Sequence, residues 1–159
     1  MNIIVKGGLR IGILCAIWTF AMGFSGWYRD PAMLMAFYAV ILIQLGVLVW
    51  GLKQTAAQGR TYGGQVAAGT LMSVVGGVII ILSSFLFTLV VFPNYFEEIR
   101  VVQQEMLKAA GKTDAEIAAE VEMAAQFQTP VMQAIFGFIG TVFTGLIGSL
   151  IIGAFYRKK

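Results

Sequence analysis

The sequence predicts an all-α integral membrane protein: a four-helix bundle with an extramembrane helical hairpin between helices three and four. Three observations support this. Hydrophobic residues make up 58% of the chain and charged residues only 12%, about half the charge of ordinary soluble domains. Four apolar stretches each exceed the length of about 20 residues that a spanning helix needs. One long polar stretch separates the last two of them. We expect residues 1–159 to form a single transmembrane domain.

The four spans are predicted over about 8–28, 31–52, 64–92 and 131–156. Arg10 is the only charged residue in the first stretch, and the other three contain none. Each stretch is therefore apolar enough to lie in hydrocarbon along its length.

The third span is longer than a bilayer requires. It must tilt, or its first turn, which includes Gln65, must project into water. Pro93 is expected to end this helix, because proline cannot continue the hydrogen-bond ladder. Pro31 and Pro130 are expected just inside helix starts, where proline is favoured. All three prolines thus mark helix ends.

The polar insert, about 94–129, is predicted to hold two helices. Apolar residues recur at helical spacing over 94–110, and Gly111 is suited to a C-terminal cap. Thr113 and Glu116 have the spacing of a capping box, which opens a second helix to about Phe127. We expect an antiparallel hairpin, or one long broken helix, outside the membrane. It serves as a docking surface, a cap over a pore mouth, or a connector.

The charged residues are sorted by side, which predicts the orientation. Seven of the 11 cations lie on one side without any acid, and the other four lie opposite with all eight acids. The positive-inside rule then places both termini in the cytoplasm. The basic edge is expected to attract anionic lipid headgroups, and no nucleic-acid partner is expected. The seven cations are Lys6, Arg10, Lys53, Arg60, Arg157, Lys158 and Lys159.

Small residues recur at a spacing of four in the predicted spans. Such rows let helix backbones approach closely in lipid, where packing replaces the hydrophobic effect as the driving force. We expect these rows to be helix-packing surfaces, within one chain or between chains. The candidate helix-packing residues are Gly69, Ser73 and Gly77 in the third span, and Gly137, Thr141, Gly145 and Ser149 in the fourth.

Groups that carry chemistry are scarce, so no catalytic residue, cofactor or metal site is predicted. The chain has no histidine and a single cysteine, which removes the commonest metal ligand and general base. No ionisable group lies near a bilayer centre, where ion-coupled transporters place theirs. Gln44 is expected to bridge helices. The candidate polar lining comprises Gln44, Ser83, Ser84 and Gln133, with Thr88 and Thr141 beside them.

The leading functional hypothesis is a non-enzymatic protein that acts through helix–helix packing, as a homo-oligomer or as an accessory subunit of a larger membrane complex. Its expected partners are membrane lipid and other membrane subunits or itself. The alternative is an oligomeric channel or small transporter lined by the hydroxyl residues. A membrane enzyme that uses Glu97, Glu98 or Asp114 with a bound cation is the third hypothesis, and nothing in the sequence indicates raised pKa values for these acids.

Several short motifs, taken in order, resemble a known family. They are TYGG at 61–64 with Gly69, FPNYFEE at 92–98, Thr129-Pro130, and 145–150 followed by RKK at 157–159. Their order and spacing resemble the bacterial membrane-protein family catalogued as domain of unknown function 4199, over nearly the whole chain. The resemblance implies a multi-pass protein of the bacterial inner membrane with four helices and an outer insert. It carries over no catalytic residue, since the family has no established activity.

Overall fold

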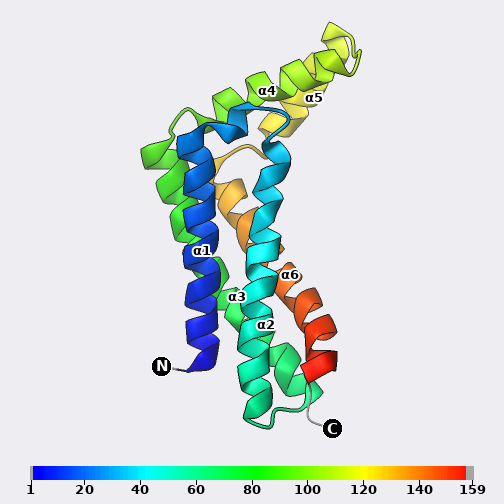
Figure 1. Cartoon of the computed structure of the whole chain (residues 1–159). Helices are drawn as coiled ribbons and strands as arrows, with labels where there is room; N and C mark the ends of the chain where they lie inside the picture. Colours follow the sequence, from blue (N-terminus) through cyan, green and yellow to red (C-terminus); the bar gives the residue numbers. More distant parts are fainter. Residues whose placement is uncertain (1, 157–159) are drawn as a thin grey trace.

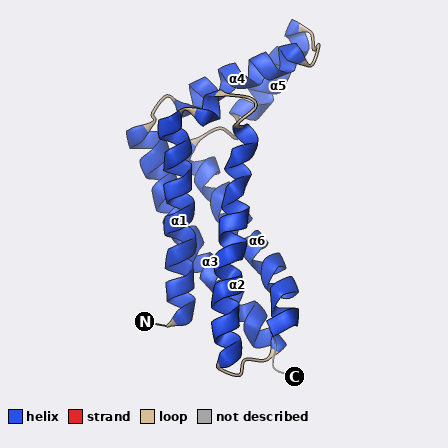
Figure 2. Cartoon of the chain, viewed as in Figure 1, coloured by secondary structure: helices blue, strands red, loops and turns tan. Residues whose placement is uncertain are grey.

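Four long apolar helices run alongside one another in the computed structural model, which describes residues 2–156 (Figure 1). All four are long and apolar enough to cross a membrane. Within the described range the chain is otherwise short helices and loops, without a strand (Figure 2). The predicted helical class and its four long apolar helices are therefore confirmed. The four are α1 (Ile3–Ser25), α2 (Ala39–Ala57), α3 (Tyr62–Phe85, continued by the π-helix η3, Leu86–Val91) and α6 (Pro130–Tyr156).

Two shorter helices, α4 (Tyr95–Ala109) and α5 (Asp114–Ala125), lie side by side and project from one end of the long helices (Figure 1). We call α4 and α5 together the arm, and the end from which they project the arm end. The opposite end, where α1 begins and α6 finishes, is the termini end. Gly111 turns the chain between the two helices with a φ of 79°, a left-handed conformation that glycine adopts without steric cost.

The helix α5 begins at the capping box that the sequence predicts. The Thr113 side chain accepts from the Glu116 N–H, and the Glu116 carboxylate accepts from the Thr113 N–H. These backbone and side-chain bonds to Thr113 hold the pKa of Glu116 below its usual value. The helix ends at Ala125 rather than at Phe127, because the following residues form a turn.

The connection between α1 and α2 differs from the prediction, which began the second span at Pro31. Pro31 lies in a turn, and α2 starts only after the short 3₁₀ helix η2 (Leu34–Tyr38). Side chains hold this segment out of a regular α-helix: the Asp30 carboxylate accepts from the Ala32 N–H (2.9 Å), and the Trp18 indole donates to the Ala36 carbonyl (3.0 Å). Hydropathy does not register such contacts, so it overextends the helix.

At the start of the third span, where the sequence predicts either a tilt or a first turn in water, the Gln65 side chain is fully buried within the protein. The Gln65 amide and the Thr55 hydroxyl are 2.6 Å apart, so each polar group satisfies the other between α3 and α2. Pro93 lies just after η3, and Pro130 is the first residue of α6.

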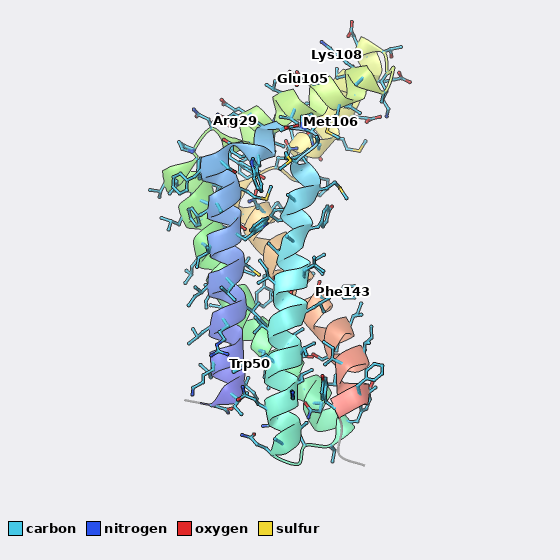
Figure 3. All side chains as sticks on the ribbon, in the orientation of Figure 1. Arg29, Trp50, Glu105, Met106, Lys108 and Phe143 are labelled. Carbon is cyan, nitrogen blue, oxygen red and sulfur yellow. The ribbon has the colours of Figure 1, made fainter. Side chains whose placement is uncertain are left out.

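The helix α3 lies at the centre of the fold. It packs most extensively against α6 and next against α1, while α2 contacts all three of the other long helices. The buried apolar cluster gathers residues from three of the four: Ile11, Cys15, Val47, Leu48 and Met72. Large apolar side chains also cover the outside of the helices, and Figure 3 shows Phe143 pointing away from them. An apolar exterior of this extent is compatible with a lipid environment.

Candidate functional site

The small residues of α3 and α6 interlock in pairs across the contact between the two helices. Gly69 faces Ser149, and Gly145 faces Ser73. A Cβ added to Gly69 would lie 2.8 Å from the Ser149 Cβ, and one added to Gly145 would overlap the Ser73 side chain. Each glycine therefore makes room for a serine of the other helix, so the two backbones approach closely.

The two serines satisfy their own hydroxyls within this contact. The Ser73 hydroxyl donates to the Gly69 carbonyl (3.0 Å), and the Ser149 hydroxyl donates to the Gly145 carbonyl (2.5 Å). Each bond runs one turn back along its own helix. The interface is thus closely packed and leaves neither serine hydroxyl without a partner.

Two further predicted packing residues, Gly77 and Gly137, lie at the same contact. A Cβ on Gly77 would lie 2.7 Å from the Phe138 ring, and one on Gly137 would lie 3.1 Å from Ile80. Thr141 is buried, and its hydroxyl donates to the Gly137 carbonyl (2.7 Å). The sequence left open whether these rows pack within a chain or between chains. The structure places six of the seven between α3 and α6 of one chain, and the carbonyl of the seventh, Thr141, accepts from Gln44 of α2.

Other glycines serve other helix pairs. Gly8 and Gly12 of α1 lie against Val75 and Ile79 of α3, and a Cβ on Gly12 would lie 2.8 Å from Ile79 Cδ1. In contrast, nothing lies within 4 Å of a Cβ added to Gly140 of α6. Equal residue types in these helices therefore have very different surroundings.

Gln44 links three helices at the centre of the structure. Its side chain is 4% exposed. Its amide nitrogen donates to the Thr141 carbonyl (2.7 Å) on α6 and to the Ser73 hydroxyl (3.2 Å) on α3. Gln44 therefore tethers α2 to the α3–α6 pair through hydrogen bonds inside an apolar core.

The other residues of the candidate polar lining are not gathered around Gln44. Ser83 lies ten residues beyond Ser73 along α3, or about 15 Å at the rise of an α-helix. The Ser83 hydroxyl donates to the Ile80 carbonyl (3.0 Å), and the Thr88 hydroxyl donates to the Ser84 carbonyl (2.8 Å). Gln133 is half-buried near the start of α6. A pore lined by these groups from several copies stays a prediction.

A polar cluster that the sequence did not indicate joins the arm to the α1–α2 connection. Arg29 donates from Nε to Glu98 Oε2 (2.7 Å) and from Nη2 to Glu98 Oε1 (3.0 Å). The hydroxyl of Tyr28, whose side chain is 4% exposed, donates to the same carboxylate. We call Tyr28, Arg29 and Glu98 the arm anchor. The only signal in the sequence was an acid after the third span and a cation after the first.

The charges of the arm anchor are set by these bonds. The hydrogen bonds from the Arg29 guanidinium hold the pKa of Glu98 below its usual value, and burial raises the pKa of Tyr28. At neutral pH the cluster is therefore a carboxylate bound by a guanidinium and a neutral phenol. In this geometry the Glu98 carboxylate is engaged in holding the arm.

Aromatic rings pack beneath the arm anchor. The Phe87 and Phe92 ring centroids are 4.6 Å apart, and those of Tyr28 and Tyr95 are 5.2 Å apart. Burial raises the pKa of Tyr95 to about 12. The Phe92 N–H donates to the Phe87 carbonyl (2.8 Å), a five-residue bond that closes the π-helix. Gly23 admits the rings, because a Cβ there would lie 2.5 Å from Phe92.

The contact between α1 and α2 leaves a groove, whereas the contact between α3 and α6 is closely packed. Near the termini end the two helices leave a groove of about 460 Å³. The Arg10 guanidinium carbon lies 3.8 Å above the centre of the Trp50 ring at this groove, close enough for a cation–π contact. Figure 3 places Trp50 on α2 beside α1. The groove is lined by Arg10, Ile13, Leu14, Gly46, Val47 and Trp50.

These features define a small helical protein with four apolar helices of membrane-spanning length and a two-helix arm. Among residues 2–156, no three or more His, Cys, Asp or Glu side chains gather into a group that could hold a metal ion.

The chain belongs to the family described as "Protein of unknown function (DUF4199)", whose model matches residues 6–158. This confirms the family resemblance drawn from the sequence motifs. Comparisons with curated proteins and with solved structures gave no match.

Proposed function

We propose that this chain is a non-enzymatic multi-pass protein of the bacterial inner membrane, with both termini in the cytoplasm and the arm outside. In this proposal it acts by assembly, as a homo-oligomer or as an accessory subunit of a larger membrane complex. The arm, anchored as a hairpin over a four-helix bundle, supplies the assembly surface.

The distribution of charge supports the orientation. Lys6, Arg10, Lys53 and Arg60 lie toward the termini end, on or between helices that carry no acid there. All eight acids lie in the α1–α2 connection or the arm. Positive residues favour the cytoplasmic side. The further cations Arg157, Lys158 and Lys159 lie outside the described residues.

The observation that carries the proposal is the surface of the arm. Of its apolar side chains, Val102 and Ile117 are buried, whereas Val101, Met106 and Met123 are exposed, Met123 by 65%. Figure 3 shows Met106 on the lower edge of the arm, and Glu105 and Lys108 on its upper edge. Exposed methionines are typical of adaptable protein-binding surfaces.

The small-residue rows of α3 and α6 are not available as an assembly surface, which also favours the arm. The pairs Gly69–Ser149 and Gly145–Ser73 are filled within one chain, so those faces offer no contact to a second protein. The arm is bonded to the α1–α2 connection at Glu98, in the first turn of α4.

Site-specific photocrosslinking in native membranes tests the assembly role. A photoreactive residue in place of Met106 or Met123 is expected to give a protein adduct whose mass identifies a second copy or another subunit. Phe143, which points outward from α6, is the control position and is expected to react with lipid. The absence of adducts at both arm positions, together with a monomer in mild detergent, would refute the proposal.

Cysteine labelling tests the orientation separately. The single native Cys15 is buried and so does not compete for reagent. Lys112→Cys, in the turn of the arm, is expected to react with a membrane-impermeant maleimide on intact spheroplasts. Gln58→Cys, in the α2–α3 turn, is expected to react only after permeabilisation. The reverse pattern would place the termini outside.

A further inference from the structure

We propose that the groove between α1 and α2 binds one anionic phospholipid of the cytoplasmic leaflet. The headgroup phosphate lies at Arg10, and one acyl chain lies along the groove toward the membrane interior. This inference goes beyond the proposed assembly role and rests on it only for the membrane placement and the orientation.

The walls of the groove suit a hydrocarbon chain. Ile13 and Leu14 line it from α1, and Gly46 and Val47 line it from α2. Its volume of about 460 Å³ falls within the range of about 300–1,000 Å³ that ligand sites occupy. A Cβ added to Gly46 would have nothing within 4 Å. The groove is therefore open at Gly46, where α2 has no side chain.

The termini end of the groove suits a phosphate. The Arg10 guanidinium is positioned over the Trp50 ring, 3.8 Å from its centre, and it forms no ion pair among the described residues. A guanidinium offers a planar fork of donors that matches phosphate geometry. Stacking on Trp50 orients this fork while leaving its donors free for a ligand.

Two further cations surround this position. Lys6 precedes Arg10 by four residues on α1, and Lys53 follows Trp50 by three residues on α2. Residues three or four apart lie on the same helix face, and both lysines are exposed. The rim of the groove is thus basic, with every acid of the chain at the other end. An anionic headgroup complements this rim better than a zwitterionic one, whose positive group is repelled.

Trp50 also fits the level at which a headgroup lies. Tryptophan is enriched at the boundary between hydrocarbon and water, and Trp50 lies one turn beyond Gly46 and Val47 toward the termini end. From the termini end, the groove therefore begins at the basic rim, continues at Trp50 and ends in the apolar part lined by Ile13, Leu14, Gly46 and Val47, which we call the trough. A phospholipid has the same order from headgroup to chain.

Native mass spectrometry of the full chain in mild detergent tests the proposal, with dioleoyl phosphatidylglycerol or dioleoyl phosphatidylcholine added. We expect one retained phosphatidylglycerol, with an affinity at least about tenfold above that for phosphatidylcholine. Arg10→Gln is expected to remove this preference. Arg60→Gln is the matched control, since Arg60 lies at the same end in the α2–α3 turn, and it is expected to keep the preference.

Gly46→Leu tests the trough by filling it. We expect the retention of phosphatidylglycerol to fall at least about tenfold. Gly140→Leu is the matched control, because Gly140 of α6 likewise has nothing within 4 Å of a Cβ but lines no part of the groove. This variant is expected to bind lipid as the unmodified chain does. Equal thermal melting of the two variants shows that lost binding does not reflect unfolding.

Three outcomes would overturn the proposal. They are equal retention of the two lipids, unchanged retention in either Arg10→Gln or Gly46→Leu, and a change of oligomeric state in Gly46→Leu, which would mean that a helix of another copy occupies the groove. None of them depends on crosslinking at the arm, so the lipid site and the assembly role fail or succeed independently.

Discussion

The α3–α6 and α1–α2 contacts are both made by antiparallel apolar helices (Figure 1), yet their packing is opposite. At the first, Gly69 and Gly145 each receive a serine of the facing helix. At the second, Gly46 receives nothing, and a groove of about 460 Å³ remains beside it. A glycine in an apolar helix can therefore mark the closest approach of two helices or the place where they stay apart.

The reason for the difference lies in where each helix uses its small residues. Gly7, Gly8 and Gly12 of α1 lie against α3, whereas α1 presents Ile13 and Leu14 to the groove beside α2. Apolar side chains gain nothing from leaving lipid for one another, and close packing is what holds such helices together. The α1–α2 pair is left with the gap that its side chains do not fill.

The largest expected effect is a clash at the closed contact. Gly69→Ser is expected to destabilise the fold by about 1–3 kcal/mol, the range for overpacking, because its Cβ would meet the Ser149 side chain. Adding Ser149→Gly is expected to recover much of the loss, since it restores one serine per pair. Unfolding in detergent mixtures measures both. A double variant no more stable than Gly69→Ser would argue against the interlocking of α3 and α6.

The next largest effect is expected at Gln44, which links α2 to the α3–α6 pair by hydrogen bonds. Gln44→Leu is expected to cost about 0.6–1.7 kcal/mol, as interhelical hydrogen bonds in membranes do, because it removes the bonds to Thr141 and Ser73. The same unfolding measurement applies. Gln133→Leu, at a half-buried amide of α6, is the control with a smaller expected loss. Equal losses of stability in the two variants would show that the hydrogen bonds of Gln44 to α3 and α6 contribute no extra stability.

A local effect is expected at the arm anchor, which ties the α1–α2 connection to α4. Glu98→Gln is expected to speed hydrogen exchange in the first turns of α4 with little change in global stability, since Arg29 and Glu98 are partly exposed. The exposed neighbour Glu97→Gln is the control. Protection of α4 that stays the same in Glu98→Gln would mean that the aromatic cluster alone holds the arm.

The arm anchor also gives a pH dependence whose sign is fixed. Because Arg29 lowers the pKa of Glu98 in the folded protein, the anchor stabilises the folded arm above the usual carboxyl pKa. This contribution shrinks below that value and is lost as pH falls through the lowered pKa. Because amide exchange itself slows as pH falls, the measured quantity is the protection factor of the α4 amides, which is expected to fall over this acidic window. The Glu98→Gln variant is expected to lack this fall.

The smallest expected effect on stability is at the open contact. Gly46→Leu is expected to leave the melting temperature unchanged or to raise stability by up to about 1 kcal/mol, since glycine is the poorer helix former and nothing lies near its Cβ. The stabilities of Gly46→Leu and Gly69→Ser together compare the open α1–α2 contact with the closely packed α3–α6 contact. Marked destabilisation by Gly46→Leu would mean that α1 and α2 pack closely at Gly46 and leave no groove there.

The parts of this fold that depend on local signals could be predicted from the sequence. The four apolar lengths, the turn at Gly111 and the capping box at Thr113 follow from composition and short-range spacing. It overextended α2 back to Pro31, because the contacts of Asp30 and Trp18 that hold that segment are not visible in hydropathy.

For the candidate site, even fewer of the contacts between residues could be predicted from the sequence. The sequence identified the small-residue rows but left their partners open, and it did not indicate that the Gln65 side chain is buried against Thr55. It gave no sign that Arg29 binds Glu98, which lies 69 residues away. Such pairings depend on how each helix is rotated about its axis.

The sequence by itself therefore determined the helical class, the number of long apolar helices and the family. These follow from chain composition, from turn chemistry and from motif order, none of which needs a neighbour in space. Only the tertiary structure decided that Gly145 meets a serine while Gly46 borders an empty groove. The physical reason is that a missing side chain is neutral in itself, and its energy is set by what the facing helix places against it.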